Sequence, residues 1–292
     1  MALRARPSGG TDERKAGASP NALPLSRHAG ALRAVSRNFA DGIPFAAPTR
    51  RPSVQNAFRP PSSFGLFPPV VKNLLILNGL AYLAQMIFQA RSGAPFSAVE
   101  MWFALWPLGG PEAIRFADGV VAFGSFQPWQ LVTSAFLHGG FGHIAFNMFG
   151  LWMFGATIER QLGSKRFLWF YLACVLGASV LQVAVTSWPF LLGGPDVGIP
   201  VPTLGASGGV LGVMAAFGLL HPNSPIFLLF FPVPIPAKWF VLGYAAFSLF
   251  AGFTSVQAGV AHFAHLGGMV TGAILVLYWL GRLPVQPRTR LT

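Results

Sequence analysis

Six long apolar segments follow one another along this chain, and they restrict its fold more than any other feature. They cover residues 69–89, 142–160, 166–187, 205–221, 236–253 and 259–280. A helix needs about 20 predominantly apolar residues to cross the hydrocarbon core of a bilayer. The segments therefore predict an all-α, polytopic membrane protein with a bundle of six transmembrane helices. The fourth segment is the shortest, and we expect it to begin below the membrane surface.

The composition supports a membrane protein and argues against one that binds nucleic acid. Only 10% of the 292 residues are charged, whereas about 25% are charged in a soluble domain. The formal net charge is +12, but ten of the twenty Lys and Arg residues lie in the first sixty positions. The positive charge is therefore concentrated in a tail and does not form a folded surface for nucleic acid.

The first 65 residues are rich in Pro, Arg, Ser and Ala, with no sustained apolar period. This composition is typical of a disordered segment. Within it, Leu32, Val35 and Phe39 share one face of a short basic helix that can lie on an anionic membrane surface. We expect three parts: a disordered basic tail over 1–65, a membrane domain over 66–282, and a short basic tail over 283–292.

The connections between the segments predict the orientation of the chain. Both tails and the connections after the second and fourth segments carry Lys and Arg, whereas the opposite connections hold only Arg91 and Arg115. The positive-inside rule therefore places both termini in the cytoplasm. We expect a bacterial cytoplasmic membrane, with the mitochondrial inner membrane as the alternative because the N-terminal tail is Arg-rich and poor in acidic residues. The apolar connection between the first two segments is expected to lie partly in the membrane interface.

Few polar side chains interrupt the apolar segments. His143 and Asn147 lie near the start of the second segment, Ser207 at the start of the fourth, and His265 in the first third of the sixth. These three segments cross the membrane in the same direction, so the four side chains are predicted to lie at a similar depth. Polar residues within a membrane face a protein interior or a water-filled cavity, and they are functional candidates.

Glycines predict a close approach between the fourth and sixth helices. Small residues on facing surfaces let the backbones of membrane helices come near each other. Such an approach can bring the Ser207 Oγ within hydrogen-bond reach of the His265 imidazole. The glycines that form these surfaces are Gly208, Gly212, Gly268 and Gly272.

This grouping of residue types favours nucleophilic catalysis by a dyad. A serine hydroxyl is a weak nucleophile that needs a base, and histidine is the side chain best suited near pH 7. No carboxylate lies at this depth, because Glu159 falls at the cytoplasmic end of its segment, where we expect it to pair with Arg160 or Arg166. His143 and Asn147 share one helical face, and with the backbone N–H of the nucleophile they can donate hydrogen bonds to an oxyanion.

At these motifs the sequence resembles the rhomboid family of intramembrane serine proteases. The matching stretches are "HGGFGHIAFNMFG" at 138–150, "GASGGVLG" at 205–212 and "AHFAHLGGMVTG" at 261–272. The resemblance extends over residues 68–281. It implies Ser207 as nucleophile, His265 as general base, and His143 and Asn147 in the oxyanion hole.

The resemblance also implies the partners of such a protein. The substrates would be single-pass membrane proteins, cleaved in or near their transmembrane segment at a site open to the non-cytoplasmic side. Neither a cofactor nor a metal is implied. In rhomboids the second and fifth helices are neighbours that are thought to form a lateral gate. Here their facing surfaces are predicted to be closed by aromatic contacts among Phe146, Phe149, Phe247, Phe250 and Phe253.

Two positions depart from the pattern of the family. Many members have Trp-Arg before the motif of the second helix, where this chain has Trp129 and Gln130. Some members have a tyrosine one turn after the nucleophile, stacked on the catalytic histidine, where this chain has Leu211. We expect His262, or an aromatic side chain from another helix, to hold the His265 ring instead.

Two other function classes stay open. A metal or haem protein could use His138, His143, His262 and His265, although the sequence has no HExxH motif and no carboxylate at the right depth. A catalytically silent rhomboid-like protein could bind membrane clients without cleaving them, although it would be expected to lack Ser207 or His265. We expect His138 to be structural, bridging the apolar connection to the second helix.

Overall fold

The computed structural model of the protein describes residues 65–92, 94–117, 119–193, 198–228, 231–254 and 261–285. The expected basic tail, with its amphipathic helix, lies outside the described residues apart from residue 65. Most of the expected C-terminal tail also lies outside them. The three-part division of the chain therefore stays a prediction.

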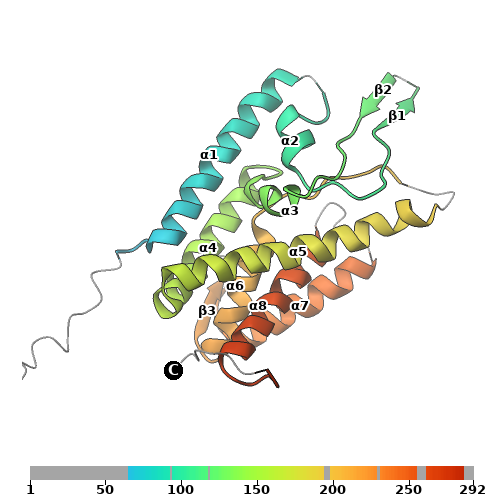
Figure 1. Ribbon diagram of the computed structural model, residues 1–292. Coiled ribbons are helices and arrows are strands. Elements are labelled where there is room, and N and C mark those ends of the chain that lie inside the picture. Colours follow the sequence, from blue (N-terminus) through green and yellow to red (C-terminus); the bar gives the residue numbers. More distant parts are fainter. Residues whose placement is uncertain are drawn as a thin grey trace, which may run out of the picture. The chain divides into compact units, whose positions relative to one another are not determined.

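Six apolar helices occupy the positions of the six predicted segments. Five of them are long and apolar enough to cross a membrane, whereas α6 has only 14 residues. The fold is thus a polytopic helical bundle, as predicted (Figure 1). The helices are α1 (Pro69–Ser92), α4 (Phe141–Leu162), α5 (Ser164–Leu192), α6 (Ser207–Leu220), α7 (Ala237–Thr254) and α8 (His262–Trp279).

The short helix α6 is the centre of the bundle. It packs against α4, α5, α7 and α8, and ten of its 14 residues are buried. A helix that contacts protein on all sides needs apolar or small residues all round, which explains why its sequence has no polar face. Helix α1 lies beside α4, and α7 lies beside α6 and α8.

The predicted close approach of the fourth and sixth segments is confirmed as the contact between α6 and α8. A Cβ atom on Gly268 would overlap the carbonyl of Gly208, and one on Gly272 would lie 2.5 Å from the carbonyl oxygen of Gly212. Real Cβ atoms essentially never come nearer than 3.0 Å to another heavy atom. Only glycine therefore permits this spacing of the two helices.

The connection between α1 and α4 is folded. A single side chain, Gln130, organises much of it from a fully buried position. Its Oε1 accepts the N–H groups of Trp106 and Gln127, and its Nε2 donates to the carbonyls of Trp102 and Ser125. The connection contains α2 (Ala98–Phe103), β1 (Ala113–Phe116), β2 (Gly119–Ala122), α3 (Gln130–Thr133) and the 3₁₀ helix η2 (Ser134–Phe136).

Two short antiparallel hairpins depart from the all-helical prediction. Strands β1 and β2 pair within the first connection, and β3 (Pro225–Leu228) pairs with β4 (Phe231–Pro236) between α6 and α7. Both hairpins lie in connections that join apolar helices along the chain, so the bundle itself remains helical.

The prediction that Glu159 pairs with an arginine was wrong. Glu159 is fully buried, and its carboxylate accepts the backbone N–H groups of Val70 and Val71 at 3.0 and 2.8 Å and the Ser164 hydroxyl. The first N–H groups of a helix have no acceptor within it, and a negative charge there is stabilised by the helix dipole. Glu159 therefore caps α1 and fixes it against α4.

Candidate active site

The structure brings Ser207 and His265 into direct contact. The His265 Nε2 lies 2.9 Å from the Ser207 Oγ. Ser207 is the first residue of α6, and His265 lies in the first turn of α8, so the glycine-mediated approach of these helices sets the distance. His265 is 7% exposed, which places the pair inside the bundle. For Nε2 to accept the serine proton, the neutral imidazole must carry its own proton on Nδ1.

Tyr244 of α7 lies at the other side of the His265 ring. Its hydroxyl is 3.3 Å from the His265 Nδ1, and the two rings are tilted by 43° with centroids 6.1 Å apart. An aromatic side chain from another helix, or His262, was predicted beside the His265 ring, but the sequence did not indicate Tyr244. A hydroxyl within an otherwise apolar segment was the signal that could have found it.

His143 lies close to the Ser207 Oγ. Its neutral ring carries the proton on Nε2, whereas a basic His265 would carry it on Nδ1. The backbone N–H of Gly139 donates to the His143 Nδ1 at 3.3 Å, so the neutral ring carries its proton on Nε2. A Cβ atom on Gly205 would lie 2.8 Å from this Nε2 and 3.7 Å from the Ser207 Oγ. Gly205 also has a φ of +132°, and the missing side chain leaves room between the N–H donor and the nucleophile.

Asn147 lies one turn after His143 on the same face of α4 and is buried. Its Nδ2 donates to the carbonyl of His143 at 3.0 Å. An amide NH₂ group has two hydrogens, so Asn147 can donate a second bond toward a ligand. The structure thus gathers the N-terminal parts of α4, α6 and α8 at one place, with the backbone N–H of Ser207 at a helix start where α6 offers no acceptor.

The segment before α6 is held by Gln182 of α5, which sequence reasoning missed. Gln182 is buried, and its Nε2 donates to the Thr203 Oγ1 at 3.1 Å while its Oε1 accepts the N–H of Ala264 at 3.0 Å. Thr203 precedes the nucleophile and Ala264 precedes His265. One amide therefore fixes the approach to both members of the pair.

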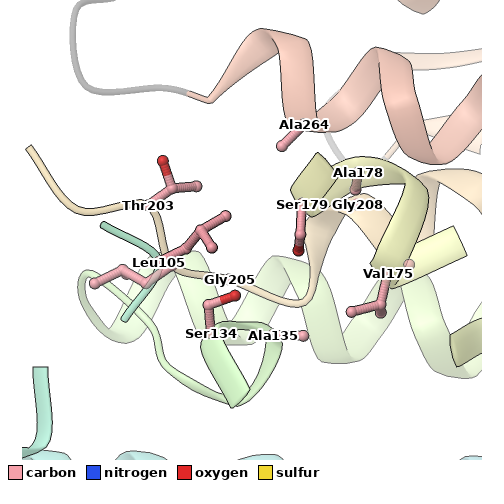
Figure 2. Close-up of a pocket in the computed structure, with 12 residues that line it drawn as sticks. Leu105, Ser134, Ala135, Val175, Ala178, Ser179, Thr203, Gly205, Gly208 and Ala264 are labelled. Carbon is pink, nitrogen blue, oxygen red and sulfur yellow. The ribbon is translucent and has the colours of Figure 1, made fainter. Parts of the chain in front are cut away.

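A small cavity of about 20 Å³ lies beside the start of α6. Figure 2 shows the side chains of Ser134, Ser179 and Thr203 around it, next to Gly205 and Gly208. A cavity of this size can hold about one water molecule when polar groups line it. The cavity is therefore large enough for about one water molecule beside Gly208, the residue that follows Ser207.

The other two histidines of the region support the site. The backbone N–H and C=O of His138 each form a 3.0 Å hydrogen bond with the Gln85 side chain of α1. Burial lowers the pKa of the His138 imidazole to about 4, so it packs edge-on against His143 as a neutral ring. His262 packs edge-on against both His265 and Phe247.

A metal or haem site built from His138, His143, His262 and His265 would require these four side chains to lie around one point. They pair instead as His138 with His143 and His262 with His265. Among the residues that the structure describes, no three His, Cys, Asp or Glu side chains form a cluster that could hold a metal ion.

The predicted aromatic contacts across the gate are absent from the described part of the chain. Phe149 contacts Trp152 of its own helix, and Phe247 contacts His262 of α8. Phe146 and Phe250 are 65% and 61% exposed. The expectation that aromatic pairs close α4 against α7 was therefore wrong, because these rings face other neighbours or the surroundings of the protein.

A buried serine–histidine pair where three apolar helices meet defines a polytopic membrane protein with the elements of a serine hydrolase. The family model of the Rhomboid domain matches residues 125–282, more than half of the chain, and the protein belongs to the rhomboid family.

Three relatives illustrate the similarity. The chain is 36% identical to RHOMBOID-like protein 12, mitochondrial, of Arabidopsis thaliana, over 59% of this chain and 53% of the relative. It is 31% identical to Rhomboid protein 1, mitochondrial, of Saccharomyces cerevisiae, over 65% of this chain and 53% of the relative. It is 30% identical to Rhomboid protease GluP of Bacillus subtilis, over 60% of this chain and 31% of the relative. The chain thus spans about half the length of these relatives or less.

Proposed function

We propose that the protein is an intramembrane serine endopeptidase that uses Ser207 and His265 as a catalytic dyad. The observation that carries the proposal is the 2.9 Å contact between the His265 Nε2 and the Ser207 Oγ inside a membrane bundle. Membership of the rhomboid family supports a hydrolase of this kind, and a relative named as a rhomboid protease agrees with it.

In the acylation step the Ser207 Oγ attacks the carbonyl carbon of the scissile peptide bond while His265 accepts its proton at Nε2. The same proton then passes from Nε2 to the leaving amine nitrogen, and the C–N bond breaks. An acyl-enzyme ester on Ser207 remains. Because no carboxylate among the described residues hydrogen-bonds to His265, the proposed dyad relies on the placement of the imidazole by its neighbours.

The tetrahedral intermediate carries a negative oxygen that needs hydrogen-bond donors already in position. We assign this role to the Nε2–H of His143, the amide of Asn147 and the backbone N–H of Ser207. The Gly139 N–H, which donates to the His143 Nδ1, supports this assignment because it leaves the ring proton on Nε2. Water then hydrolyses the ester with His265 acting again as base, and the cavity lined by Ser134, Ser179 and Thr203 is a source for it.

The substrates that we propose are single-pass membrane proteins, cut in or near their transmembrane segment. A buried site within an apolar bundle is reached from the lipid, and we propose that a substrate helix enters between α4 and α7. The protein is an integral, multi-pass membrane protein. Two relatives carry mitochondrial names and one is bacterial, so we propose no single membrane. Both termini are proposed to face the cytoplasm in a bacterial membrane, or the matrix in the mitochondrial inner membrane.

Cleavage of a transmembrane substrate by purified protein in detergent tests the proposal. Ser207→Ala and His265→Ala should each abolish proteolysis without unfolding the protein, and the double variant should be no worse than either single one because a dyad acts as a unit. A chelator should leave the rate unchanged. Substantial cleavage by Ser207→Ala would contradict the proposal, and a wild-type protein that binds substrates but never cleaves them would favour a silent rhomboid-like protein.

A further inference from the structure

Helix α7 contributes one polar contact to the candidate site, and the proposed reaction as set out above does not use it. The Tyr244 hydroxyl lies 3.3 Å from the His265 Nδ1. The ring geometry, with a tilt of 43° and centroids 6.1 Å apart, is that of a hydrogen bond at the ring edge rather than a stacked pair. The contact is therefore directional and reports on which nitrogen carries the proton.

The proposed role of the His265 Nε2 determines that Nδ1 carries the ring proton. His265 presents Nε2 to the Ser207 Oγ at 2.9 Å, and Nε2 must be unprotonated to accept the serine proton. Nδ1 then carries the hydrogen, and the Tyr244 oxygen accepts it. This bond persists when the ring becomes an imidazolium, and a hydrogen bond from a charged donor is stronger than one from a neutral donor. The contact thus favours both the reactive tautomer and the charged form that follows.

The next hydroxyl along α7 after that of Tyr244 belongs to Ser248. Ser248 lies four residues further along α7, on the same helical face, and is 1% exposed. Its Oγ has no hydrogen-bond partner among the described residues. The hydrogen bond that the Tyr244 hydroxyl makes within the described part of the chain is the one with the His265 Nδ1.

The remaining contacts of α7 are sparse. Its buried residues are Ala237, Ser248 and Ala251, and it packs on α6 and α8. The position on α6 that carries a stacking tyrosine in some rhomboids is Leu211 here, and its side chain cannot hydrogen-bond. The side chain that contacts the Nδ1 of the proposed base thus lies on α7, a loosely packed neighbour, and not on α6, which carries Ser207.

We propose that Tyr244 is the positioning residue of the dyad: it holds His265 in the Nδ1–H tautomer from α7. This inference rests on the proposed function of Ser207 and His265. It makes the placement of α7 part of the catalytic arrangement, because a displacement of α7 that breaks the contact leaves the Nδ1–H of His265 without this acceptor.

The test compares Tyr244→Phe with wild type in detergent, using a transmembrane substrate and a small soluble ester. Loss of a hydrogen bond to a charged group predicts a fall in kcat of about 10- to 100-fold for both substrates, with KM nearly unchanged. The matched control is Tyr82→Phe on α1, which removes a partly buried tyrosine hydroxyl away from the site and should leave kcat unchanged.

A second readout separates positioning from packing. In ¹⁵N-histidine spectra, the His265 signals, assigned by their loss in His265→Ala, should report the Nδ1–H tautomer in wild type and a mixture of tautomers in Tyr244→Phe. Unchanged kcat in Tyr244→Phe would overturn the inference. A lower kcat with an unchanged tautomer would overturn it as well, because Tyr244 would then act only by packing. Cleavage by Ser207→Ala would instead reject the proposed function itself.

Discussion

Two histidines at this site are assigned opposite tautomers by their neighbours. The Gly139 N–H donates to the Nδ1 of His143 and leaves the proton on Nε2, whereas the proposed role of His265 as a base toward Ser207 requires the proton on Nδ1. Which ring nitrogen is protonated depends on the hydrogen bond that the other nitrogen makes. The two tautomers therefore agree with the proposed roles, in which His143 donates to an oxyanion and His265 acts as a base.

Removal of the oxyanion donors is predicted to give graded losses. Loss of one donor typically lowers the rate by about 10²–10³-fold, so His143→Ala should fall in this range. Asn147→Ala should lose less if the other two donors stay in place, because one of its amide hydrogens is already engaged by the His143 carbonyl. The measurement is kcat for a soluble ester.

The control for these variants is His221→Ala, which removes a half-buried histidine that contacts Gln161. Its kcat should equal that of wild type. Wild-type rates in both His143→Ala and Asn147→Ala would remove these residues from the site.

At the level of helices, the contact between α6 and α8 sets the distance between Ser207 and His265. Gly208 faces Gly268 and Gly212 faces Gly272 with backbone against backbone. The N-terminal ends of the two helices carry Ser207 and His265. Added volume at these glycines is therefore expected to separate the Ser207 and His265 side chains.

Gly268→Ala is predicted to impair both folding stability and catalysis. The new methyl group would overlap the Gly208 carbonyl, so α8 must shift, and overpacking of this kind costs about 1–3 kcal/mol. Thermal unfolding in detergent and kcat for a soluble ester measure the two effects. The matched control is Gly79→Ala on α1, where an added Cβ meets no atom within 4 Å. An active Gly268→Ala with a wild-type unfolding temperature would show that the spacing of the helices does not set the dyad.

The helices and the contact between Ser207 and His265 could be predicted from the sequence, whereas the supporting contacts could not. The length of the apolar segments predicted the positions of the helices. The spacing of the glycines predicted the close approach of α6 and α8 that brings Ser207 to His265. Gln182 and Tyr244 were missed because their roles depend on which helix faces which, and segment length carries no such information. Glu159 was misassigned for a related reason: its partners are backbone N–H groups of α1, which leave no signature in the order of charged residues.

At the level of the whole molecule, the buried site must be reached by a substrate through a route between helices. His265 is 7% exposed, whereas Phe146 of α4 and Phe250 of α7 are largely exposed. No aromatic pair among the described residues joins these two helices. Entry of a substrate helix between them would therefore not require the breaking of such a pair, and α7 could separate from its neighbours at low cost.

Cross-linking α4 to α7 is predicted to block transmembrane substrates selectively. Phe146→Cys and Phe250→Cys can be joined by a flexible, reducible bis-maleimide linker, since the single native cysteine, Cys174, is buried. The cross-linked protein should lose cleavage of a transmembrane substrate and keep hydrolysis of a small ester, because both substrates share one chemical step. Reduction should restore the first activity.

The controls for this experiment are the two single-cysteine variants treated with the same reagent. If the cross-linked protein cleaves the transmembrane substrate at the uncross-linked rate, the substrate enters elsewhere, for example past the segment over 188–204.

Covalent labelling of the nucleophile tests the central claim most directly. A fluorophosphonate reacts only with a serine whose hydroxyl is activated by a base. We predict stoichiometric labelling of the wild-type protein on Ser207, located by peptide mass spectrometry, and its loss in both Ser207→Ala and His265→Ala. Ser179→Ala is the matched control and should label like wild type, since Ser179 Oγ donates to the Leu131 carbonyl. Labelling that persists in Ser207→Ala, or a folded wild-type protein that never reacts, would contradict the assignment of Ser207 and His265 as a catalytic dyad.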